Sequence, residues 1–259
     1  MNKFSLDNSD NIKEKNKVVY IVNNIAFFVS HRMPIAIKLI AKGHEVSLIT
    51  GNAGSQIMEN KAKEILSNHN IKYYKVSLST SLKKLPLDII GLIEIILLLN
   101  RIRPDVVHTA SPKANIFGGI AAKFVKIRLI VFSISGMGYV YTEDKKIHIR
   151  MIRILLTFIF KWIFNNKNKK IIVQNTFDEN FINKKFDVDI KDIVKFPGSG
   201  VDLNLFKNHH HLNKKNIILF PARIIREKGI YEFVYTAMKL KPKYTDWQFI
   251  IAGTIDYDT

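Results

Sequence analysis

The sequence has no cysteine and no apolar segment near its start. The absence of cysteine from all 259 residues excludes a disulfide-stabilised scaffold and suits a reducing cytoplasm. Residues 1–17 are polar and contain no apolar core of signal-peptide length, so we expect no secretion signal.

Acidic residues are scarce, because 22 Asp and Glu face 40 Lys and Arg, for a formal net charge of +18. An excess of this size favours an anionic partner: a phosphorylated ligand, a membrane surface or a nucleic acid. Lysine is abundant along the whole chain, so part of the excess reflects composition. The sequence contains no recognisable nucleic-acid-binding module, and we expect no nucleic-acid partner.

Uninterrupted apolar runs of bilayer length are also missing. Leu85 to Leu99 is short for a span, which needs roughly 20 apolar residues, and it contains Asp88 and Glu94. Ile147 to Phe164 is interrupted by basic residues. We interpret both as amphipathic or buried helices. The second either rests on anionic lipid or packs on the core with a solvated cationic face; its polar and interfacial residues are Arg150, Arg153, Lys161 and Trp162.

Short β-branched runs alternate with helical patterns along most of the chain, and 47% of the residues are hydrophobic. This alternation predicts an α/β fold with a doubly wound parallel sheet, in which ligands bind beyond the carboxyl ends of the strands. Asn23 to Ser30 is predicted to be a loop. The predicted strands are 18–22, 45–50, 71–76, 106–108, 129–132, 171–173 and 194–196, and the predicted helices are 32–41, 56–67, 87–102, 113–125 and 147–164.

Pro197-Gly198-Ser199-Gly200 is the strongest break in the chain. We therefore predict a polar leader (1–17), a complete Rossmann-like domain (18–198), a linker (199–215) and the start of a second Rossmann-like domain (216–259). The last part has only two strands and one helix, too few to cover both faces of a sheet.

The stretch from Leu219 to Val234 reads as a strand, a basic loop and the opening of a helix. Such a joint aims backbone N–H groups and the positive end of the helix at one point. Arg223 and Lys228, with Gly229 at the helix entry, are therefore candidates for a diphosphate clamp. The alternative is a solvated basic loop in a lysine-rich protein.

Five motifs, in order along nearly the whole chain, resemble the GT-B glycosyltransferases of family 4. The closest likeness is to bacterial enzymes that extend undecaprenyl-diphosphate-linked glycans for O-antigen, capsule or protein glycosylation. The residues that carry the resemblance are His31-Arg32-Met33-Pro34; Arg103 to His108 followed by Ser111 to Asn115 and Gly118-Gly119; Ser135-Gly136-Met137-Gly138-Tyr139; Ser199-Gly200-Val201-Asp202 with Phe206; and Arg223 with Lys228-Gly229.

The resemblance implies roles for several of these residues. Arg223, Lys228 and Gly229 would bind the donor diphosphate and stabilise the leaving nucleotide, because preplaced cations offset the charge that develops there. His108 would be catalytic at the rim of the sheet, although a rim histidine that only hydrogen-bonds the backbone is an open alternative. On the acceptor side the resemblance places His31, Arg32, Lys113 and Gly136.

The implied reaction is a retaining transfer of a hexose or N-acetylhexosamine from a UDP-sugar to a lipid-linked saccharide acceptor. The scheme needs neither a metal ion nor another cofactor, and no Asp-x-Asp metal motif stands in a suitable loop. The enzyme would work in the cytoplasm, peripherally at the inner face of the plasma membrane, with an anionic membrane surface as a partner.

The sequence also departs from the family pattern. The Glu-x7-Glu region that grips the donor would fall beyond Thr259, so we expect a C-terminally truncated chain with little or no transferase activity. A separately encoded C-terminal half would be its partner. The alternatives are a non-catalytic glycolipid-binding remnant and another GT-B enzyme, such as a nucleotide-sugar epimerase.

Overall fold

A computed structural model describes residues 15–51, 56–79, 85–136, 141, 147–204, 206 and 216–253. The chain divides into two compact units, Met1–Gly200 and Val201–Thr259, which are described here one at a time.

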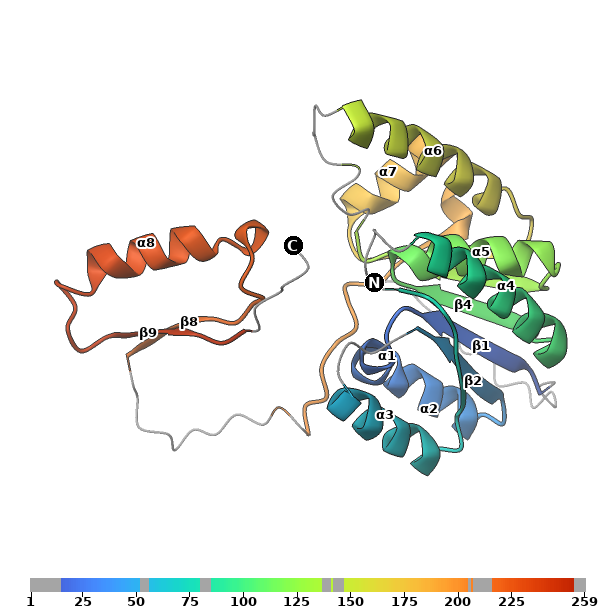
Figure 1. Cartoon of the computed structure of the whole chain (residues 1–259), viewed down its shortest axis with the longest axis horizontal. Coiled ribbons are helices and arrows are strands. Elements are labelled where there is room, and N and C mark those ends of the chain that lie inside the picture. The colour runs from blue at the N-terminus through green and yellow to red at the C-terminus, as the bar shows by residue number, and fades with distance from the viewer. Residues whose placement is uncertain are drawn as a thin grey trace, which may run out of the picture. The chain divides into compact units, whose positions relative to one another are not determined.

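The first unit is built on a seven-stranded parallel sheet with the order β3-β2-β1-β4-β5-β6-β7 (Figure 1). The chain runs outward from β1 to β3, crosses back and continues outward from β4, so the order reverses between β1 and β4. The strands are β1 (Lys17–Val22), β2 (Glu45–Thr50), β3 (Lys72–Lys75), β4 (Val106–Ala110), β5 (Leu129–Ser133), β6 (Lys169–Val173) and β7 (Ile193–Lys195).

Helices cover both faces of this sheet, as buried parallel strands require. One core packs α1, α2 and α3 on the sheet, and a second core packs α4, α5, α6 and α7 on the opposite face. The helices are α1 (Ile25–His31), α2 (Met33–Ala41), α3 (Gln56–Asn68), α4 (Leu85–Ile102), α5 (Pro112–Phe124), α6 (Ile147–Phe164) and α7 (Thr176–Phe186), with a 3-10 turn, η2 (Ile190–Asp192), before β7.

Strand alternation sorts the side chains of β1 between the two cores. Val19 and Ile21 enter the core under α4 to α7, whereas Tyr20 enters the core under α1 to α3. In β4, Val107 enters the same core as Val19 and Ile21, under α4 to α7. His108 therefore lies on the same face as Tyr20, which it pairs with in register.

Helix α5 lies close to the sheet because of two consecutive glycines. A Cβ atom at Gly118 would stand 2.8 Å from a methyl carbon of Thr109, and one at Gly119 would stand 2.8 Å from the ring of Phe132. Larger residues would push the helix away from the strands.

The second unit contains a parallel pair, β8 (Ile217–Phe220) and β9 (Gln248–Ile251), connected by a 3-10 turn, η3 (Arg226–Lys228), and helix α8 (Ile230–Leu240). Phe233 of α8 packs on Phe220 and Phe249. Several aliphatic side chains of the strands remain exposed, including Leu219 at 50% and Ile251 at 42%.

These observations confirm the predicted fold class, but two local predictions were wrong. The segment predicted as a loop at Asn23–Ser30 contains α1, because the side chain of Asn24 caps the helix by accepting from the N–H of Ala26 at 2.7 Å. Helix α7 was missed altogether. Its cap is Asn175, whose side chain accepts from the N–H of Asp178 at 2.8 Å.

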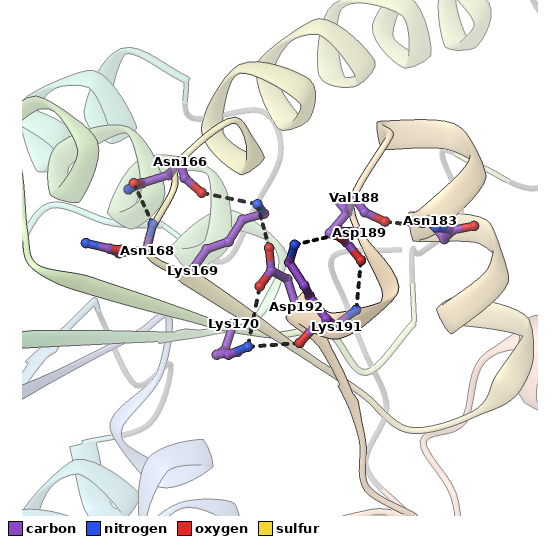
Figure 2. Close-up of polar contacts among 9 residues, drawn as sticks. All are labelled: Asn166, Asn168, Lys169, Lys170, Asn183, Val188, Asp189, Lys191 and Asp192. Atoms are coloured by element: carbon purple, nitrogen blue, oxygen red, sulfur yellow. Dashed lines mark hydrogen bonds and ion pairs between the residues drawn. The ribbon is translucent and has the colours of Figure 1, made fainter.

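A polar cluster joins the amino end of β6 to η2 (Figure 2). Lys169 and Lys170 both pair with Asp192, at 3.1 and 3.4 Å, and Asp189 pairs with Lys191 at 2.8 Å. Burial raises the pKa of Asp192, but the hydrogen bonds and charges of Lys169 and Lys170 outweigh burial, and the pKa is lowered overall.

We predict that Asp192→Asn lowers the free energy of unfolding at pH 7 by about 1 to 3 kcal/mol, because two lysines lose a charged acceptor. The stabilisation by this carboxylate is complete above its unfolded-state pKa and disappears as the pH falls through its lower folded-state pKa. In urea unfolding measured at several pH values, the stability of the variant should therefore fall less in acid than that of the wild type.

The matched control is Asp189→Asn, whose side chain is 53% exposed and, among the described residues, forms an ion pair with one lysine, Lys191. It should destabilise less than Asp192→Asn. Equal effects of the two substitutions would contradict the importance assigned to Asp192.

Candidate functional site

The point where the strand order reverses, between β1 and β4, is where open α/β sheets bind ligands. The loops that leave these two strands touch, since the N–H of Asn23 donates to Oγ of Ser111 at 3.3 Å. Polar side chains from positions far apart in the sequence, between residues 20 and 199, lie close together here.

His108 is held inside the sheet at this point. Its Nε2 atom is 2.8 Å from Oγ of Ser133 on the neighbouring strand β5, and its ring lies 4.8 Å from that of Tyr20 on the other side. Burial, together with the charge of Arg32, lowers the pKa of His108 to about 3. The imidazole is therefore neutral at physiological pH, with one nitrogen that can donate a hydrogen bond and one that can accept.

Arg32 supplies the positive charge at the site from the junction of α1 and α2. It is only 8% exposed. One Nη atom donates to the carbonyl of His31 at 3.2 Å and to Oγ of Ser199 at 3.1 Å, and the guanidinium lies 5.6 Å from the ring centre of Phe27. Burial lowers the pKa of Arg32, and the charge of Tyr20 partly opposes this shift.

Three buried polar atoms around Arg32 have no hydrogen-bond partner among the described residues: Nε of Arg32, the hydroxyl of Tyr20 and Oδ1 of Asn23. Burial raises the pKa of Tyr20 to about 12, which the charge of Arg32 partly opposes. Unpaired buried polar atoms are costly, and they mark places where a ligand or water completes the hydrogen bonds. The unpaired donor on a buried guanidinium suits an anionic oxygen.

The backbone at Ser111 is strained at the same edge. Its φ of 102° and ψ of 151° lie in a region that L-residues rarely adopt. Asn115 holds the segment by accepting from the Thr109 hydroxyl at 2.7 Å and donating to the carbonyl of Ser133 at 3.0 Å. Strain of this kind persists only where the surroundings fix it, and it is typical of binding sites.

Lys113 lies in the first turn of α5 and is buried in an ion pair with Asp88 of α4. Its Nζ atom also donates to Oγ of Ser79 at 2.8 Å, while Asp88 accepts from the N–H of Ser79 at 2.8 Å. Lys113 thereby fixes the loop after β3 to the start of α5. An acceptor-side role for Lys113 stays a prediction.

Two further predicted acceptor-side residues lie on this edge. His31 is exposed, stacks on Phe27 with ring centres 4.7 Å apart, and contacts Oγ of Ser30 at 2.6 Å. Gly136 follows β5 with a positive φ of 120°, a conformation that favours glycine. Residues 137–140, which include Gly138, lie outside the described residues.

The predicted donor residues lie in the second unit, at the carboxyl end of β8. Gly229 has a φ of 82° and joins η3 to α8, so Lys228 stands beside the positive end of that helix. Arg223 is exposed in the loop that follows β8. The structure thus brings His31, Arg32, His108, Lys113 and Gly136 to one edge of the first unit and Arg223, Lys228 and Gly229 to one loop of the second.

Sequence reasoning missed Tyr20 as a member of the site, and it predicted neither the contact of Ser133 with His108 nor that of Ser199 with Arg32. Alternation does predict that Tyr20 shares a face with Val18 and Val22. Its contact with His108, however, depends on the pairing of β1 with β4, which no local pattern specifies.

Comparison with known proteins identifies the family to which the first unit is similar. The family described as glycosyl transferase 4-like matches residues 17–175. An N,N'-diacetylbacillosaminyl-diphospho-undecaprenol alpha-1,3-N-acetylgalactosaminyltransferase of Campylobacter jejuni is 26% identical over 61% of this chain and 44% of its own length. The capsular polysaccharide biosynthesis glycosyltransferase CapM of Staphylococcus aureus is 23% identical over 65% of this chain and 46% of its own length.

The chain thus spans less than half the length of these curated relatives. Solved structures share the fold. A glycosyltransferase of Rickettsia africae has a TM-score of 0.59 at 16% identity, covering 95% of this chain and 69% of that one. A putative UDP-N-acetylglucosamine 2-epimerase of Listeria monocytogenes has a TM-score of 0.65 at 14% identity, covering 94% and 64%.

We predict that His108 makes the stability of the protein depend on pH. Its folded-state pKa of about 3 lies below the ordinary value of 6.5, so protonation favours the unfolded chain. Stability is complete above about pH 6.5 and falls towards pH 3, by up to about 1.4 kcal/mol per pH unit from this group. His108→Gln should remove this component in urea unfolding measured at several pH values.

Ser133→Ala serves as the matched variant, because it deletes the hydrogen-bond partner but leaves His108 buried. Since burial is the main cause of the shift, the pH dependence should persist in Ser133→Ala. A wild type whose pH profile matches that of His108→Gln would refute the neutral buried imidazole.

Proposed function

The chain belongs to the glycosyl transferase 4-like family, and we propose that it serves in the transfer of a hexose or N-acetylhexosamine from a UDP-sugar to an undecaprenyl-diphosphate-linked glycan. The names of its relatives support this class of reaction, since they include two transferases that act on diphospho-undecaprenol-linked sugars. The observation that carries the proposal is the buried Arg32 with an unpaired Nε atom at the sheet reversal.

On the acceptor side, Arg32 and His31 bind the diphosphate of the lipid-linked saccharide. A guanidinium that is shielded from water holds phosphate oxygens through charge-assisted hydrogen bonds, each worth about 1.5 to 3 kcal/mol. His108 is neutral and partnered by Ser133, which suits contact with a sugar hydroxyl. Lys113 acts on this edge through the position of the α5 N-terminus.

On the donor side, Arg223, Lys228 and Gly229 receive the diphosphate of the UDP-sugar. Departure of UDP builds negative charge on the diphosphate oxygens, and cations beside a helix N-terminus stabilise that charge. The transfer proceeds with retention of the anomeric configuration and without a metal ion. NMR of the product's anomeric proton tests the first statement, and an assay in excess EDTA tests the second.

The reaction takes place at the inner face of the plasma membrane, with anionic lipid as a partner. Within the described residues no helix has the length and hydropathy needed to cross a bilayer. Helix α6 carries Arg150, Arg153 and Lys161 but no acidic residue, and Trp162 is 47% exposed beside them. A basic amphipathic helix with an interfacial tryptophan suits peripheral attachment to anionic lipid.

The polypeptide could instead bind the glycolipid without transferring a sugar. This alternative is favoured by the acceptor-side residues, which lie together in the first unit. A chain that binds the lipid-linked saccharide tightly but does not bind UDP would support the alternative over the transferase. The epimerase alternative has only a shared fold in its favour.

We predict that Arg32→Gln weakens binding of a short-chain polyprenyl-diphosphate-linked N-acetylhexosamine about tenfold to a hundredfold, because one or two charge-assisted hydrogen bonds are lost. Isothermal titration calorimetry measures the affinity. The matched control is Arg128→Gln, an exposed arginine near the amino end of β5. It should bind like the wild type.

Arg32→Lys separates binding from folding, because it retains the charge but loses the second nitrogen of the fork. It should fold like the wild type and bind with intermediate affinity. Unchanged affinity in both folded Arg32 variants would rule out the acceptor-side role.

We predict that Lys228→Gln weakens the binding of UDP about tenfold, because a charge beside the diphosphate is lost. Lys239→Gln is the control, since Lys239 lies in the last turn of α8 with its ammonium 4.5 Å from the ring centre of Tyr235. Ligand-observed NMR titration measures both. If UDP binds equally to the two variants, the donor clamp is wrong.

A further inference from the structure

The outer surface of the helix layer formed by α4, α5 and α6 carries rows of exposed apolar side chains on α4 and α6 and a single one, Phe124, at the end of α5. Helix α5 lies between the other two and contacts both (Figure 1). Each helix already packs one side on the sheet, so these are additional apolar residues that face away from it. The exposed fractions are 51% for Ile90, 54% for Ile93 and 64% for Leu97 in α4; 72% for Phe124 in α5; and 66% for Met151, 60% for Leu155 and 69% for Phe158 in α6.

We infer that this surface, the α4–α5–α6 face, docks as one unit on an anionic lipid bilayer, with α4 contributing apolar insertion beside the basic helix α6. The inference rests on the membrane partner of the proposed function and extends it from α6 to all three helices. A row at positions 90, 93 and 97 lies along one side of α4, as a helix lying flat in an interface requires.

The charge pattern selects lipid as the occupant. Acidic residues occur only in α4 among these three helices, and both are turned to the loop after β3. Asp88 pairs with Lys113, and Glu94 accepts from the N–H of Ser77 at 2.5 Å. The outward-facing rows therefore carry no carboxylate, while Arg150 and Lys161 flank the row on α6.

Helix α3, on the opposite face of the sheet, has a different character. Ile57 and Met58 of α3 are exposed at 73% and 55%, but they stand among Glu59, Lys61 and Lys63. Exposed apolar residues scattered among charges are ordinary on a soluble surface, whereas a layer of uncharged rows marks an interaction surface.

Docking on this face also fixes the orientation of the site. The three helices follow β3, β4 and β5, so all of them begin at the carboxyl edge where Arg32 and His108 lie. A bilayer against the layer therefore brings phosphate groups of lipids alongside that edge. The surface would then hold the protein on the bilayer that contains the lipid-linked diphosphate, and the site would bind that diphosphate.

The test is co-sedimentation of the whole chain with vesicles of phosphatidylcholine and phosphatidylglycerol at low salt. Ile93→Gln with Leu97→Gln should weaken binding about fivefold to tenfold, because two inserted side chains are lost. Met151→Gln with Phe158→Gln in α6 should have a similar effect. The matched control, Ile57→Gln with Met58→Gln in α3, should bind like the wild type.

Glutamine favours helix and these side chains are exposed, so thermal unfolding of each variant should match the wild type. Wild-type affinity in the α4 variant, with binding lost in the α6 variant, would overturn the three-helix surface. A wild-type dimer that the α4 variant converts to monomer, with vesicle binding unchanged, would assign the face to a second copy and also overturn it.

Failure of the proposed function is measured separately. Binding of UDP and of the short-chain acceptor, without vesicles, should be the same in all these variants and in the wild type. Lost ligand binding with intact vesicle binding would contradict the proposed function and leave the docking surface standing.

Discussion

The pairing of β1 with β4 is the constraint on which the site depends. This pairing sets Tyr20 beside His108 in the middle of a sheet that is covered on both faces. A charged imidazole would be costly there, so burial keeps His108 neutral and the charge of Arg32 reinforces the effect. The site thus holds the buried guanidinium of Arg32 beside a neutral hydrogen-bonding ring, at the point where the strand order reverses.

Most of the fold could be predicted because its signals are local and periodic. Buried parallel strands appear as short β-branched runs, and the predicted strands lie within two residues of those observed. The failures occurred where a single capping side chain decides the structure. Asn24 and Asn175 begin α1 and α7 in segments whose apolar spacing is weak, and the sequence pattern therefore suggested a loop or nothing at all.

The site was less predictable, because its residues meet only through tertiary structure. His31 and Arg32 follow β1, and His108 lies two residues before the end of β4, so a rule about strand ends places them on one edge of the sheet. The rule does not specify which residues these side chains contact. Ser133 reaches His108 from the next strand, Ser199 reaches Arg32 across 167 positions, and Asp88 neutralises Lys113, which local sequence presents as an available cation.

The buried pair of Asp88 and Lys113 connects the outer surface of the helix layer with the edge of the sheet. By turning its carboxylate inward, α4 leaves its outward row uncharged, which lowers the cost of placing that row against lipid. The same ion pair fixes Ser79 against the first turn of α5, next to the strained Ser111. Removing either partner of this buried ion pair would leave an uncompensated charge. The pair therefore strongly restrains both the orientation of α4 and the position of Ser79 at the start of α5. The apolar docking face and the polar edge therefore have a common structural origin in the first turns of α4 and α5.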